Sequence, residues 1–138
     1  MIRKILVPYD GSAQSEKAFE FALDIAQKYS AFMILLSVVR PPEPPLPEMQ
    51  AVVLNTAAEY YRKHFRALKE KADAVDVCVR LDVVEGHPAE QIVHMALKES
   101  ADMIVMGHRG ESFMQKWLLG SVARRVMSYA HCPVLIIR

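Results

Sequence analysis

A glycine-containing segment near the end of the sequence has the residue types that bind phosphate groups. Gly107, Gly110, Gly120 and Ser121 form the pattern G-x2-G-x9-G-S. Glycine lets a backbone approach a phosphate closely and present successive N–H groups to it. If Gly120 and Ser121 begin a helix, its free N–H groups and its dipole attract an anion as well. The spacing therefore predicts an anion site, and the Ser121 hydroxyl is a further donor.

The same residues also have a simpler interpretation. Single loop glycines are ordinary turn residues, and Ser121 would then serve only as a helix cap. The complete spacing directly after a predicted strand favours the anion site, and Arg109 and Lys116 supply cations within the segment. Familiar phosphate motifs are absent, since no GxxxxGK[ST] occurs and Gly11 stands alone where a dinucleotide fold has GxGxxG.

Catalytic groups are harder to find than binding groups. The five histidines form no HxxxH, HExxH or Ser/His/Asp arrangement, although the loops of His87 and His108 face the predicted site. Efficient phosphoryl transfer needs a positioned base and a metal ion. We assign no catalytic residue and no metal-ligating residue. Cys78 and Cys132 are far apart in the sequence without a CxxC spacing, which argues against a disulfide or a zinc site.

Strand and helix patterns alternate along the sequence and position these loops. Apolar runs of strand type occupy residues 4–8, 32–39, 77–84, 102–106 and 133–137. Helical patterns begin after Ser12, cover residues 49–73, begin again at Pro88 and cover residues 121–130. The expected buried stripe of the first helix is Ala18, Ala22, Ile25, Ala26 and Tyr29. The alternation predicts an α/β open sheet of five mostly parallel strands, Rossmann-like, with four helices on both faces.

Ligands of such sheets bind beyond the carboxyl ends of the strands, where the strand order reverses. The loops at that edge are residues 9–12, 39–47, 85–88 and 107–120. The glycine segment belongs to this set. Five prolines between residues 41 and 47 predict an extended, exposed loop. The strand 77–84 alternates apolar residues with Arg80 and Asp82, so we expect it to be covered on one face or to lie at an edge.

Composition excludes several classes of protein. A length of 138 residues predicts one domain, residues 1–138, and 52% hydrophobic residues are enough for a core. The formal net charge of +1 argues against a nucleic-acid partner, which usually requires a basic excess. The longest apolar runs are far shorter than the roughly 20 residues that span a membrane. With no export signal recognised, we expect a cytoplasmic protein.

Four stretches resemble the universal stress protein family, and together the resemblance covers essentially the whole sequence. They are VPYDGSAQSEKA, EGHPAEQI, MGHRG and LLGSVARRVMSYAHCPVLIIR. The pattern G-x2-G-x9-G-[ST] is the signature of the ATP-binding branch of that family, whereas another branch has lost it. Two departures are minor: His108 stands where the family more often has Ser or Thr, and the proline loop is denser than usual.

The resemblance implies an adenine-nucleotide site by position, in a fold of the adenine nucleotide alpha-hydrolase type. Pro8 and Asp10 resemble residues that line the adenine and ribose side, and Val38 the residue whose backbone meets the adenine edge. From the sequence alone, Val38 is a strand valine and Asp10 is equally well a turn carboxylate. The segment that passes under the ribose and phosphates corresponds to Gly107, His108, Arg109 and Gly110. The start of the triphosphate-binding helix corresponds to Gly120, Ser121 and Val122.

The function that the resemblance implies is that of a small cytoplasmic sensor or adaptor. It would bind ATP, with Mg²⁺ or Mn²⁺ held through the phosphates, and present an altered surface to a protein partner that the sequence does not identify. Two alternatives stay open. One is a slow ATP hydrolase or nucleotidyl-transfer enzyme of the related fold. The other is a dimeric interaction module with a vestigial nucleotide site.

The last strand predicts an assembly. In the strand order of the family that the chain resembles, residues 133–137 lie at a sheet edge, and no charge within the run protects their free backbone groups. We expect a homodimer in which this strand pairs with its copy. The alternative is a monomer whose edge is covered by a loop such as the proline segment.

Overall fold

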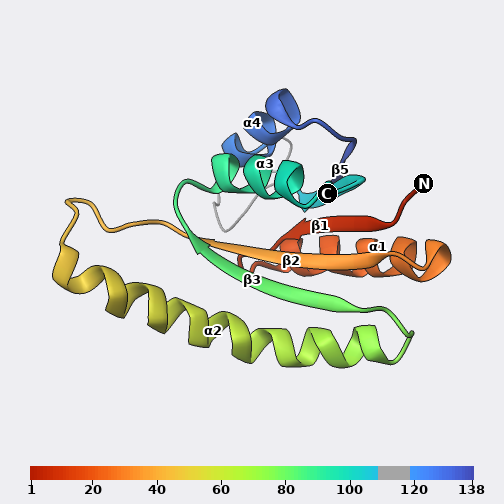
Figure 1. The fold of residues 1–138 in the computed structure, drawn as a ribbon, viewed down its shortest axis with the longest axis horizontal. Coiled ribbons are helices and arrows are strands. Elements are labelled where there is room, and N and C mark those ends of the chain that lie inside the picture. The colour runs from red at the N-terminus through yellow and green to blue at the C-terminus, as the bar shows by residue number, and fades with distance from the viewer. Residues whose placement is uncertain (109–118) are drawn as a thin grey trace.

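The computed structural model describes residues 1–108 and 119–138, in which strands and helices alternate as predicted (Figure 1). The elements are β1 (Lys4–Pro8), α1 (Ala13–Tyr29), β2 (Phe32–Val39), α2 (Pro47–Asp73), β3 (Val79–Glu85), α3 (Pro88–Lys98), β4 (Met103–Gly107), α4 (Ser121–Tyr129) and β5 (Val134–Ile137). None of the described helices is both long enough and apolar enough to cross a membrane. Cys78 and Cys132 are both free thiols.

The strands form one parallel sheet in the order β3-β2-β1-β4-β5. The predicted α/β open sheet is therefore confirmed. The chain builds outward from β1 through β2 to β3, and then crosses back to place β4 on the other side of β1. The strand order thus reverses between β1 and β4, whose register pairs Ile5 with Met103. β3 and β5 are the two edge strands, as expected for both.

The sheet is covered on both faces, because its central strands are apolar on both sides. One core joins Ile5, Val7 and Phe19 beneath α1 and α2, and the other joins Leu6 and Ile34 beneath α3 and α4. Figure 1 shows α3 and α4 on one side of the strands and α1 and α2 on the other. The sheet thus has one helical layer on each face.

Three local predictions were wrong. α2 begins at Pro47 rather than at residue 49, because proline suits the first helical position. β3 begins at Val79 rather than at residue 77, since the N–H of Val77 donates to the carbonyl of Ala72 and closes the end of α2. Tyr29 is 59% exposed, and the buried side of α1 runs instead through Phe19 and neighbouring residues.

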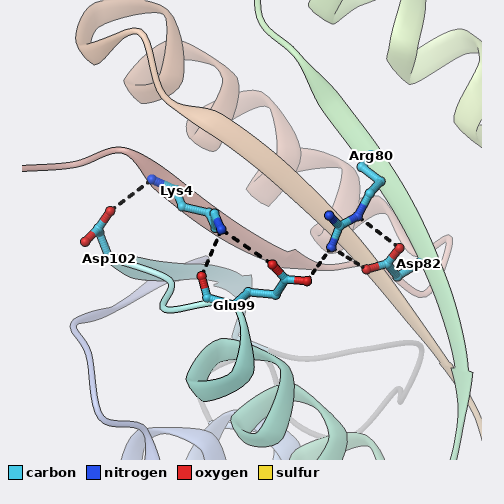
Figure 2. Close-up of polar contacts among 5 residues, drawn as sticks. All are labelled: Lys4, Arg80, Asp82, Glu99 and Asp102. Atoms are coloured by element: carbon cyan, nitrogen blue, oxygen red, sulfur yellow. Dashed lines mark hydrogen bonds and ion pairs between the residues drawn. The ribbon is translucent and has the colours of Figure 1, made fainter.

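Five charged residues form a network at the amino edge of the sheet (Figure 2). Arg80 contacts the carboxylates of Asp82 at 2.8 Å and Glu99 at 2.7 Å, and Lys4 Nζ lies 3.4 Å from Glu99. Asp102 accepts backbone N–H groups at the start of β1 over 2.8 and 3.0 Å. The network ties β1, β3 and the end of α3 together, on the edge opposite the predicted site. Arg80, with Lys4, lowers the pKa of Glu99 below its ordinary value.

Candidate functional site

The ends of β1 and β4 lie next to each other at the reversal of strand order, where open α/β sheets bind ligands. Pro8 ends β1 and is followed by Tyr9 and Asp10, while Gly107 ends β4 and is followed by His108. The structure thus brings the predicted residues of the first and fourth strands to one place. The Asp10 side chain is exposed there.

Asp10 occupies a turn that starts α1. Its Oδ1 accepts the N–H of Ser12 over 2.9 Å, and Ser12 in turn caps the helix by accepting the N–H of Ser15 over 3.1 Å. Gly11 between them has φ +85°, a conformation that favours glycine. Asp10 thus serves as a turn carboxylate, but this role occupies only one of its two carboxylate oxygens. Within the part of the chain that the structure describes, the second oxygen has no hydrogen-bond partner.

His108 connects three elements at the end of β4. Its N–H donates to the carbonyl of Ile137 over 2.8 Å, and its carbonyl accepts the N–H of Gly120 over 2.7 Å. His108 is 5% exposed, and its Nδ1 lies 3.1 Å from Oε1 of Gln14 at the start of α1. The imidazole therefore packs against α1.

Gly107 lies close to the first turn of α1. A Cβ atom at this position would lie 3.1 Å from Cβ of Gln14 and 3.2 Å from its backbone carbon. The tight packing against α1 therefore favours glycine at this position, whether or not a phosphate lies nearby. Sequence reasoning assigned Gln14 no part in the site. A polar residue in the first turn of a helix is too common to signal such a contact.

α4 begins where the anion site was predicted. Gly120 is the N-cap, with φ −65° and ψ 157°, and no side chain within residues 1–108 and 119–138 caps the helix. Ser121 is exposed at the first helical position, Val122 is half-buried, and the first turn contains no acidic residue. The interpretation of Ser121 as the cap is therefore wrong. The N–H groups that begin α4 are suited to an anion, apart from that of Gly120, which His108 already accepts.

The remaining predicted residues belong to other elements or lie outside the described residues. Val38 is half-buried near the end of β2 and pairs in register with β3. His87 is exposed at the start of α3 and lines an open pocket of about 270 Å³ with Arg40, Pro41 and Glu43. None of the described residues that line this pocket follows β1 or β4. The predicted residues Arg109 and Gly110 lie outside the described residues. Among residues 1–108 and 119–138, no group of three or more His, Cys, Asp or Glu side chains could hold a metal ion.

Comparison with known proteins identifies the family. A sequence model of the universal stress protein family matches residues 1–138. This chain belongs to the universal stress protein family. The resemblance found in the sequence is thereby confirmed.

Curated universal stress proteins match along the full chain. Universal stress protein MJ0531 of Methanocaldococcus jannaschii is 36% identical over 141 residues, covering 100% of this chain and 83% of that protein. Universal stress protein YxiE of Bacillus subtilis is 32% identical over 157 residues and is covered completely, as is this chain.

Solved universal stress protein structures share the fold. UspA from Lactobacillus plantarum superposes with a TM-score of 0.91 at 27% identity, covering 99% of this chain and 98% of that one. A universal stress protein solved in complex with cAMP gives a TM-score of 0.77 at 27% identity, covering 99% and 97%.

Proposed function

We propose that this universal stress protein binds an adenine nucleotide, ATP in particular, and acts as a nucleotide-dependent sensor or adaptor in the cytoplasm, with residues 1–138 forming one domain. The observation that carries the proposal is the Gly120–His108 bond. It places the start of α4 directly beside the reversal of strand order. The cAMP complex of a relative with the same fold supports an adenine nucleotide as the ligand class.

The residues at the edge fit such a ligand. Asp10 has a carboxylate oxygen available for a ribose hydroxyl or an amino group, and Pro8 and Val38 provide apolar and backbone contacts beside it. The Ser121 hydroxyl and the N–H groups that begin α4 would hold phosphates. A Mg²⁺ or Mn²⁺ ion bound through the phosphates would neutralise their charge. Gly107, His108, Arg109 and Gly110, with Gly120 and Val122 at the start of α4, complete the proposed set.

A sensor requires that binding changes a surface. His108 contacts α4, β5 and α1 at once, so a ligand that stabilises one arrangement of the α4 start also favours one arrangement of these neighbours. The shift can be no larger than the difference in the ligand's affinity for the two arrangements. The partner that reads the surface is a protein.

We also propose that the protein is a homodimer through β5. The carbonyl of Pro133 accepts the N–H of Ile104 in β4, and the carbonyl of Ile137 accepts the N–H of His108, which follows β4. Because alternate residues of a strand bond to opposite sides, the N–H and C=O groups of Val134 and Ile136 face away from the sheet. This free edge can pair with a second copy.

Analysis of bound nucleotide tests the ligand class. The purified protein is denatured, and any released small molecule is identified by chromatography and mass spectrometry, with and without prior incubation with MgATP. We expect an adenine nucleotide in amounts close to the protein concentration. A preparation that releases none, even after the incubation, contradicts the proposal. Gly120→Val protein purified in parallel shows whether the nucleotide comes from this site.

A further inference from the structure

The turn that presents Asp10 is fixed on two sides by neighbouring elements. On the strand side, the N–H of Tyr9 donates to the carbonyl of Leu36 over 2.8 Å, and the buried hydroxyl of Ser37 donates to the carbonyl of Tyr9 over 2.8 Å. On the helix side, the turn ends in the cap of α1. Neither set of contacts covers the outer face of Gly11.

The side chain of Tyr60, from the middle of α2, covers this face of Gly11. A Cβ atom at Gly11 would lie 2.9 Å from the Tyr60 Oη and 3.5 Å from its Cε1. The phenol therefore rests directly on the turn. α2 lies beside the edge strand β3, so the contact comes from an element that supplies none of the predicted site residues.

An aromatic group holds Tyr60 in this position. Its ring centroid lies 5.2 Å from that of Tyr61, edge to face, and 4.3 Å from that of His64. His64 Nδ1 lies 2.9 Å from the carbonyl of Tyr60, within hydrogen-bond distance. Tyr61 packs edge to face on Tyr9 with a centroid distance of 6.3 Å. Contacts among these rings thus connect α2 to the end of β1.

We infer that Tyr60 is a positioning residue for Asp10. A glycine at φ +85° has many other conformations available, and a turn that samples them must be ordered again when a ligand binds. Tyr60 restricts the turn before binding. Because the side chain is 46% exposed, its removal disturbs the cores little. The ligand in this inference is the adenine nucleotide of the proposed function, on which it rests.

Two measurements on Tyr60→Leu test the inference. The first is amide hydrogen exchange of Ser12, whose N–H donates to Asp10. The second is the affinity for MgATP by calorimetry. We expect faster exchange at Ser12 and an affinity weaker by about threefold to tenfold, the cost of ordering a flexible group on binding. The midpoint of global unfolding should stay near that of the wild type. Tyr60→Phe, which keeps the ring, should retain most of the protection of the Ser12 amide and most of the affinity for MgATP. Tyr29→Leu, at a tyrosine 59% exposed on α1, is the control.

A second pair of variants tests the contact itself. Gly11→Ala introduces a Cβ that meets Tyr60 Oη, and Tyr60→Phe removes that oxygen, which leaves the next contact at an ordinary 3.5 Å. The strain of a Cβ at φ +85° persists in both variants, so the double variant should recover only the part of the affinity that the Tyr60 contact costs. If Gly11→Ala and the double variant bind equally weakly, the steric contact with the Tyr60 hydroxyl is overturned.

The outcomes separate the two claims. If Tyr60→Leu binds MgATP as tightly as the wild type, the positioning inference is overturned and the proposed function stands. If the wild type binds no adenine nucleotide, the proposed function fails. The amide hydrogen exchange rate of Ser12 then still shows whether Tyr60 holds the turn. If this rate is unchanged in Tyr60→Leu, the positioning inference is overturned as well.

Discussion

The backbone N–H of Gly120 donates to the carbonyl of His108 over 2.7 Å and joins the start of α4 to the end of β4. The N–H of His108 donates in turn to Ile137 in β5, and its ring lies against Gln14 in α1. One residue therefore links the proposed phosphate-binding helix to the proposed dimer strand and to the helix that follows the Asp10 turn. A change at the start of α4 should therefore affect both β5 and α1.

Gly120→Val should abolish nucleotide binding while the protein stays folded. The backbone of Gly120, at φ −65° and ψ 157°, is one that valine adopts readily, so the substitution adds no backbone strain. The added side chain would occupy the space proposed for the phosphates. Ala130→Val, at φ −66° and ψ 141° at the other end of α4, is a matched control. Calorimetry with MgATP measures nucleotide binding by each variant, and the thermal midpoint shows whether the variant is folded. Normal binding by Gly120→Val would refute the assignment of this loop to the phosphates.

Asp10→Asn should weaken nucleotide binding without unfolding the α1 start. The amide oxygen of asparagine can still accept the N–H of Ser12, but the second group no longer offers a charged acceptor. Hydrogen bonds to charged groups exceed neutral ones by about 1 kcal/mol, so the expected loss is roughly fivefold in affinity. Asp24→Asn, an exposed carboxylate on α1 that pairs with Lys28, should bind as the wild type does. Equal affinity for the two variants would leave Asp10 with a turn function only.

Stability should decrease in acid because of the network at the amino edge. Arg80 lowers the pKa of Glu99, and backbone N–H groups at the start of β1 lower the pKa of Asp102. The unfolded chain therefore binds more protons in acid than the folded one. The stabilisation is complete above the ordinary carboxyl range of about 3.9 to 4.3 and is lost as pH falls through the lower folded values.

Glu99→Gln tests this pH dependence. The variant should be less stable at pH 7 by about 1 kcal/mol or less, and its stability should fall less steeply in acid. Denaturant unfolding at several pH values measures both effects, with Glu59→Gln on the exposed side of α2 as the control. Parallel curves for Glu99→Gln and the wild type would show that the network makes no such contribution.

Ile136→Pro should convert the proposed dimer to a monomer. The N–H of Ile136 faces away from β4, so proline at this position removes an edge donor and leaves the pairing with β4 in place. Light scattering at micromolar concentration should give twice 15.6 kDa for the wild type and 15.6 kDa for the variant. Circular dichroism checks that the variant is folded. A wild-type mass of 15.6 kDa would contradict the dimer.

The sheet could be predicted from the sequence because its signals are local. Apolar runs such as residues 32–39 are buried on both faces in the structure, and Pro88 begins α3 as its position indicated. The stripe of α1 was misplaced toward Tyr29 because periodicity fixes the spacing of a helical face but not its rotation against the sheet. Phe19, which is fully buried, marks the true centre of that face.

The candidate site was predicted only in outline. The positions of Asp10 and Gly120 at the carboxyl edge follow from the strand ends, which the sequence shows. The burial of the His108 ring against Gln14, and the cover that Tyr60 gives Gly11, depend on contacts between residues distant in the chain. Such contacts are set by how α1 and α2 pack on the sheet, and no spacing rule within a single segment reports them.

Calorimetric titration of the purified protein with MgATP tests the central claim most directly. Bound nucleotide is first removed by unfolding and refolding, and the thermal midpoint is measured in parallel. We expect one site per chain with a dissociation constant in the micromolar range, and a thermal midpoint that rises with nucleotide concentration. No heat and no thermal shift at millimolar MgATP would contradict it.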